Sequence, residues 1–153
     1  MSLYGDRRQF DFWKMRRNGI PNVHIAQESG VTRQAVYQGL VAMDRRVEEE
    51  LRAMAGSNRI RIERINPVTG VLIGHSVPFN TGAVIFLSAR HGIQVWYDHD
   101  GDCGGCEKRD ECIALLSDYS EELNIPLADH RNPARMAEIL FATIKSRMDH
   151  ELV

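Results

Sequence analysis

The chain lacks the segments that would carry it into or across a membrane. Its first residues, MSLYGDRRQFDFWK, contain no apolar stretch of the kind that a secretory signal needs. Elsewhere no apolar run approaches the roughly 20 residues that span a bilayer. We therefore expect a cytoplasmic protein that does not enter a membrane.

The sequence also lacks the motifs of common catalytic sites. It contains no HExxH, no H-x-E with P-C-x-x-C, and no nucleophile–base motif. His75, His91, His130 and His150 stand isolated, and each is better explained as a surface or satisfied polar residue than as a catalyst. We expect a protein that is not an enzyme.

Cysteine is scarce, and its three residues lie close together as C-x2-C-x5-C: Cys103, Cys106 and Cys112. An odd, clustered set argues against a disulfide framework. The two glycines in the first loop leave the backbone free to wrap an ion, and a helix starting near Cys112 favours a thiolate there. These residues predict a tetrahedral zinc site, with His99 as the fourth ligand.

Several alternatives remain open at this cluster. The cysteines could be free thiols, and the fourth ligand could be His91, His75 or an aspartate at position 98, 100 or 102. The cysteine spacing resembles the distal part of the iron–sulfur motif in RecB-like nucleases associated with CRISPR adaptation. That resemblance implies a 4Fe–4S cluster as the rival to zinc. It implies no nuclease activity, because the carboxylate–lysine set and the fourth cysteine of those nucleases are absent.

The stretch NVHIAQESGVTRQAVYQGLVAMD, residues 22–44, predicts a helix-turn-helix. Ala26 is small where two helices would cross, and Gly30 sits where the turn needs a left-handed backbone. Thr32 is a good N-cap for the second helix. Val36 and Leu40 are four residues apart, so they lie on one face and point back at the first helix. The plain alternative is an ordinary helical hairpin with a glycine turn.

In this motif the start of the second helix enters the major groove of DNA. Arginine and glutamine can make bidentate contacts to base edges there. The segment AQESGVTRQAVYQGLVAMDRRVEEELRAM, residues 26–54, resembles the helix-turn-helix of prokaryotic regulators. In running from a recognition helix into a long charged helix, it is similar to archaeal Tfx-type regulators and the DNA-reading helices of sigma factors. The resemblance implies recognition by Thr32, Arg33, Gln34, Tyr37 and Gln38, and DNA-backbone contacts by Arg45 and Arg46.

The recognition helix is predicted to continue to residue 54, although Gly39 weakens it by roughly 1 kcal/mol. An apolar seam runs along it: Leu40, Met43, Val47, Leu51 and Met54. This seam either packs on the chain's own core or forms a dimer contact. We favour a homodimer, because repressor-type heads read two half-sites.

The charges are divided unevenly along the chain. Residues 1–61 carry a net charge of +4, and residues 62–153 carry −6. A basic helical half on an acidic body suits a DNA-binding head. A first helix, residues 6–17, ends in Lys14, Arg16 and Arg17, which suit either a phosphate backbone or a solvated helix end.

After residue 58 the hydrophobic pattern changes from helical to alternating, which predicts an antiparallel meander of four strands. The strands are RIRIERI, VLIGHSV, AVIFLSA and IQVWY. A helix over residues 113–123 follows, and then one that is capped by Asn132 and begins at Pro133. The apolar stripe of the last helix is expected to cover the sheet.

The expected fold class is α+β. An all-α helix-turn-helix head, residues 1–57, precedes a domain over residues 58–153 that combines a small antiparallel sheet, a metal knuckle and covering helices. The expected function is a DNA-binding transcriptional regulator with a structural or sensory metal site, whose partners are double-stranded DNA and a second copy of the chain. One alternative is a small zinc or iron–sulfur redox protein or metalloenzyme that uses the helix-turn-helix only as a scaffold. Another is an interaction adaptor held together by zinc.

Overall fold

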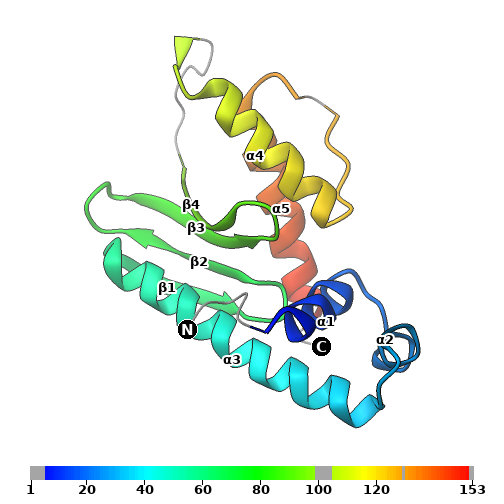
Figure 1. The fold of residues 1–153 in the computed structure, drawn as a ribbon. Helices are drawn as coiled ribbons and strands as arrows, with labels where there is room; N and C mark the ends of the chain where they lie inside the picture. Colours follow the sequence, from blue (N-terminus) through cyan, green and yellow to red (C-terminus); the bar gives the residue numbers. More distant parts are fainter. Residues whose placement is uncertain (1–5, 99–104, 129, 152–153) are drawn as a thin grey trace.

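The computed structural model describes residues 6–98, 105–128 and 130–151, which form five helices and a four-stranded sheet (Figure 1). The helices are α1 (Arg7–Arg17), α2 (Asn22–Ser29), α3 (Arg33–Ser57), α4 (Arg109–Glu122) and α5 (Pro133–Glu151). The strands are β1 (Ile60–Asn66), β2 (Val71–Ser76), β3 (Thr81–Ser88) and β4 (Gly92–Tyr97). The α+β class is as predicted.

The sheet is an antiparallel meander in the order β1-β2-β3-β4, as the alternating pattern predicted. In Figure 1, α3 runs along one side of this sheet and α4 and α5 lie on the other. Side chains alternate between the two faces with the period of two that a strand imposes. In β3, Ala83, Ile85 and Leu87 join the core beneath α3, whereas Val84 and Phe86 join the core beneath α4 and α5.

A bulge in β1 keeps three isoleucines on one face. Ile62 pairs with Gly74 and Arg64 pairs with Ile73, so Glu63 is the extra residue. Because the extra residue reverses the alternation beyond it, Ile65 returns to the same core as Ile62.

Side-chain caps set the starts of α1 and α5 where the sequence predicted these helices. Asp6 Oδ1 accepts from the Gln9 N–H at 3.1 Å at the start of α1. Asn132 Oδ1 accepts from the Ala134 N–H at 3.1 Å at the start of α5. The exception is α4, which begins at Arg109, four residues before the expected start.

The long helix α3 is continuous over 25 residues and passes through Gly39 without a break. Phe12 of α1 packs at this glycine, where an added Cβ would lie 3.1 Å from the ring. Glycine lowers the helix propensity of α3 at this position, but its small size lets α1 and α3 cross closely.

The apolar seam of α3 is not a dimer contact. Met43, Val47 and Leu51 are fully buried within the one chain, in the same core as residues of α1 and the sheet. The alternative in which the seam packs on the chain's own core is confirmed, and the favoured use of the seam between subunits is wrong. The homodimer stays a prediction that needs another surface.

One core crosses the position expected to divide the chain at residues 57 and 58. Trp13 of α1 is fully buried, and its Nε1 donates to the Pro67 carbonyl at 3.0 Å in the turn after β1. Ile25 of α2 and Leu72 of β2 belong to this same cluster. The helical segment and the sheet therefore share their hydrophobic interior, and their independent folding stays a prediction.

The two arginines at the basic end of α1 form ion pairs with other helices of the protein, which corrects both readings for these two residues. Arg16 pairs with Asp44 of α3. Arg17 is almost completely buried and pairs with Glu122 at the end of α4. Only Lys14 keeps a surface position, where it pairs with Asp11 at 3.3 Å. Sequence spacing could not foresee this, because both arginine partners are distant in sequence.

Among the helices that the structure describes, none combines the length and apolar character needed to cross a membrane.

Candidate nucleic-acid interface and cysteine cluster

The turn between α2 and α3 has the geometry that its residues predicted. Gly30 adopts φ +67°, a left-handed conformation that costs glycine little. Thr32 Oγ1 accepts from the Ala35 N–H at 3.0 Å and so caps α3. Ile25 of α2 and Val36 of α3 are both fully buried in the shared core. These contacts hold the first turns of α3 at the surface.

The five side chains expected to read DNA all lie on the surface: Thr32, Arg33, Gln34, Tyr37 and Gln38. Tyr37 has 62% of its surface exposed, which is unusual for so large an aromatic side chain. Among the described residues, none accepts or donates a side-chain hydrogen bond to Arg33, Gln34 or Gln38. Their polar groups are therefore available to a ligand.

One exposed valine joins this surface, and the sequence reading missed it. Val41 is 45% exposed and lies one turn beyond Tyr37. The signal for Val41 was its spacing, four residues after Tyr37, which places both on one side of the helix. Apolar groups beside arginine and glutamine can contact thymine methyl groups in the major groove.

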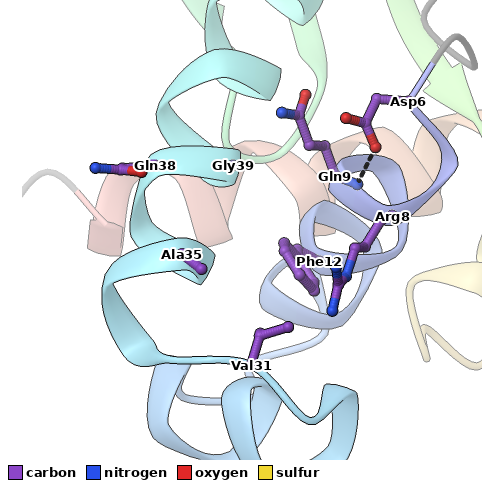
Figure 2. Close-up of a pocket in the computed structure, with 8 residues that line it drawn as sticks. All are labelled: Asp6, Arg8, Gln9, Phe12, Val31, Ala35, Gln38 and Gly39. Carbon is purple, nitrogen blue, oxygen red and sulfur yellow. Dashed lines mark hydrogen bonds between the residues drawn. The ribbon is translucent and has the colours of Figure 1, made fainter.

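A crevice of about 240 Å³ separates the start of α1 from the start of α3 (Figure 2). Phe12, Val31 and Ala35 line its apolar part, and Figure 2 shows Gln38 pointing away from α1. The crevice is below the roughly 300–1,000 Å³ of typical small-molecule pockets. We therefore regard it as part of the helix crossing, and the outward Gln38 as part of the exposed surface.

The two arginines implied for DNA-backbone contacts occupy different environments. Arg45 is exposed on α3. Arg46 is half-buried, and its Nη1 is shielded from solvent without a hydrogen-bond partner in the described part of the chain. Of the two, Arg45 is the more accessible to an approaching phosphate.

The cysteine cluster is described only in part, because Cys103 and His99 lie outside the described residues. Cys106 is exposed, and Cys112 is partly buried against the core beneath α4 and α5. Within the described residues, no three histidine, cysteine or acidic side chains come together as a metal site.

The local setting of Cys112 fits the donor chemistry of a thiolate site. It lies in the first turn of α4, where backbone N–H groups and the helix dipole favour a negative sulfur. Thiolate and imidazole donors suit zinc, and four thiolates suit an iron–sulfur cluster. Cys103, Cys106, Cys112 and His99 are the residues that would hold zinc.

Two alternative histidine ligands are engaged elsewhere. The Nε2 atom of His91 lies 2.7 Å from a carboxylate oxygen of Asp118, and that hydrogen bond lowers the pKa of Asp118 from its ordinary value of 3.8. His75 Nε2 lies 3.1 Å from Asn80 Oδ1 in the turn between β2 and β3. Neither histidine joins the described cysteines in a metal-binding group.

Comparison with known proteins gave no relatives: no family model, no curated protein and no solved structure matches this chain.

Proposed function

We propose that the chain is a DNA-binding transcriptional regulator, with the start of α3 as its recognition segment and a cysteine metal centre in its acidic half. The observation that carries this proposal is the surface of that segment. Its arginine and two glutamines are exposed and free of partners within the described residues, at the start of a helix anchored by buried Val36. Exposed donors and acceptors at this position suit base edges in a major groove.

The nature of the exposed side chains also supports DNA over a purely structural hairpin. Gln34 and Gln38 lie on the same side of α3 as Tyr37 and Val41, so the surface mixes hydrogen-bonding and apolar groups. A helical hairpin that served only as a scaffold would gain nothing from exposing a tyrosine to this extent. Arg45 extends the same side and would add a phosphate contact.

Selection from random DNA sequences tests the proposal directly. We expect enrichment of a defined sequence, and loss of that selectivity in the double variant Arg33→Ala/Gln34→Ala. Each bidentate base contact contributes about 1–3 kcal/mol of discrimination, so the variant should lose at least about tenfold in preference. The measurement is the ratio of affinities for the selected site and a scrambled site at one fixed salt concentration.

Arg135→Ala is the matched control, because Arg135 is also exposed but lies on α5, on the other side of the sheet. It should leave the affinity ratio unchanged. Unaltered circular dichroism and metal content must accompany the loss in Arg33→Ala/Gln34→Ala. The assignment fails if selective binding survives in that variant, and the function fails if selection enriches no sequence.

For the metal centre we propose zinc bound by Cys103, Cys106, Cys112 and His99. When bound, zinc would join the loop to the start of α4 and stabilise the acidic half. Metal analysis of protein purified without oxygen should find about one zinc per chain. The substitutions Cys106→Ser and Cys112→Ser should each lower that content.

A brown protein that absorbs visible light and contains iron would replace zinc by the 4Fe–4S alternative. In that case the redox-protein function becomes the stronger candidate if random DNA selection also fails. Metal-free protein in which all three thiols react with a labelling reagent would remove the metal centre altogether.

A further inference from the structure

A shallow groove follows one side of the second half of α3 and is lined by Ala42, Arg45, Arg46, Glu49 and Glu50. Each arginine has a glutamate four residues further along the helix. Within the described residues, neither arginine forms an ion pair with it. Acid-before-base is the favourable order for such helix pairs, and Glu48 with Arg52 does pair, at 3.8 Å. The groove is therefore lined by two cations and two anions that form no ion pair within the described part of the chain.

We propose that this groove binds the same groove of a second copy, so that two α3 helices pack antiparallel about a twofold axis. With the axis near residues 47 and 48, Arg45 meets Glu49 of the other copy and Arg46 meets Glu50. The twofold axis makes each Arg–Glu pair occur twice, because a symmetric interface uses the same patch on both subunits. Every charge in the groove then faces its opposite.

The helical positions of these residues agree with that arrangement. Successive residues turn by about 100° around a helix. Ala42, Arg46, Glu49 and Ala53 therefore form one stripe. Arg45 and Glu50 lie on its two flanks. In the proposed register Ala42 faces Ala53 of the partner, and these small side chains let the helices approach closely. An antiparallel twofold pair brings each flank against its own equivalent, so Arg45 reaches Glu49 on one side and Arg46 reaches Glu50 on the other.

The arrangement also gives the spacing that a DNA-reading dimer requires; this step rests on the proposed function. The centre of the recognition segment, between Ala35 and Val36, lies twelve residues from the axis. At about 1.5 Å per residue this is roughly 18 Å, so the two segments lie about 36 Å apart. Half-sites on DNA are about 34–36 Å apart. Gln34 and Gln38 lie toward the Arg45 flank, which the twofold keeps on one side of the dimer, so both segments face the same way.

This inference reassigns both arginines from phosphate contacts to subunit contacts. It also supplies a surface for the homodimer in place of the buried seam. The two assignments predict different results for Glu49→Arg. If this surface contacts phosphates, the added positive charge should strengthen DNA binding. If it contacts a second copy, the substitution should weaken the dimer.

Charge reversal and mixing test the interface without DNA. The variants Arg45→Glu and Glu49→Arg each place like charges opposite one another, and both positions are exposed, so folding should be preserved. Sedimentation velocity should find a dimer for the unaltered chain, and a dimer dissociation constant raised at least about tenfold for each variant. An equimolar mixture of the two variants should form a heterodimer, because both of its Arg–Glu pairs are then complementary.

Arg52→Glu is the control, since it makes the same charge change on the same helix but outside the groove. It should leave the dimer intact. The single variants Arg46→Glu and Glu50→Arg, mixed in equal amounts, repeat the mixing test on the other flank. A monomeric unaltered chain overturns the inference, as does a dimer that survives both reversals or a mixture that fails to associate. Because no DNA is present, these outcomes are independent of whether the chain reads DNA.

Discussion

The buried pair between Arg17 and Glu122 should be a major determinant of stability, and Glu122→Ala tests this. The side chains are 3% and 8% exposed. The Glu122 carboxylate accepts from Arg17 Nη2 at 3.3 Å, from Ser88 Oγ at 2.6 Å and from the Ala89 N–H. One carboxylate therefore joins α1, α4 and the turn between β3 and β4.

Removing this carboxylate leaves a buried guanidinium and two further donors without their acceptor. Breaking a buried pair on one side costs about 3–5 kcal/mol. Arg17 keeps a hydrogen bond to the Leu87 carbonyl at 2.8 Å and its position 4.6 Å from the centre of the Trp13 ring. We therefore expect the lower end, about 3 kcal/mol, which corresponds to a fall in Tm of roughly 6–12 °C for a chain of this size.

Urea and thermal unfolding followed by circular dichroism measure this loss. The neighbouring Glu121 provides the control, because it is 71% exposed and lies one residue earlier on α4. Glu121→Ala makes the same change in helix propensity but should alter the free energy of unfolding by less than about 1 kcal/mol. The reasoning is refuted if the two variants lose the same stability. Arg17→Met/Glu122→Leu should recover part of the loss, because it leaves no buried charge unpaired.

Three further perturbations follow from single contacts. The hydrogen bond from His91 lowers the pKa of Asp118, so the pair stabilises the fold above the ordinary value of 3.8 and is lost as pH falls through the lowered pKa. Carboxyl NMR should find that pKa below 3.8, and His91→Gln should raise it; an unmoved value contradicts the contact. Tyr119→Phe should leave the free energy of unfolding unchanged or raise it by about 1 kcal/mol, because the buried hydroxyl has no partner among the described residues. A loss above about 1 kcal/mol in urea unfolding would mean that the hydroxyl is hydrogen-bonded. Gly70→Ala should cost about 2–3 kcal/mol in the same assay, since φ is +78° and the new Cβ would lie 2.8 Å from the Trp13 ring; full stability would show that the turn can rearrange.

If the α3 groove forms the dimer, the long helix has two separate tasks. Its first turns would face DNA, and its second half would set the distance between two such segments through the positions of Arg45 and Glu49. The length of α3 then matters as much as its sequence. Inserting one residue between these parts would rotate the recognition side chains by about 100° and move them by 1.5 Å, which is a sensitive change for half-site spacing.

Local features of this protein were readable from the sequence because they depend on near neighbours. Thr32 and Asn132 cap helices through N–H groups two or three residues away, and Gly30 allows a left-handed turn by itself. The strands followed from a period of two, and the covering helix α5 followed from its apolar stripe. The surface position of Tyr37 followed from its place beside, and not on, the helix face that carries Val36 and Leu40.

The tertiary structure decided which faces meet and which charges are removed from water. The seam of α3 could equally have joined two subunits, until packing against α1 and the sheet filled it. Arg17 looked like a solvated helix end, because nothing local marks a partner 105 residues away. Cys106 and Cys112 were grouped by spacing alone, and spacing does not specify ligand geometry. A periodic hydrophobic pattern in the sequence predicts that a side chain is buried. Which residues it packs against depends on how the whole chain folds.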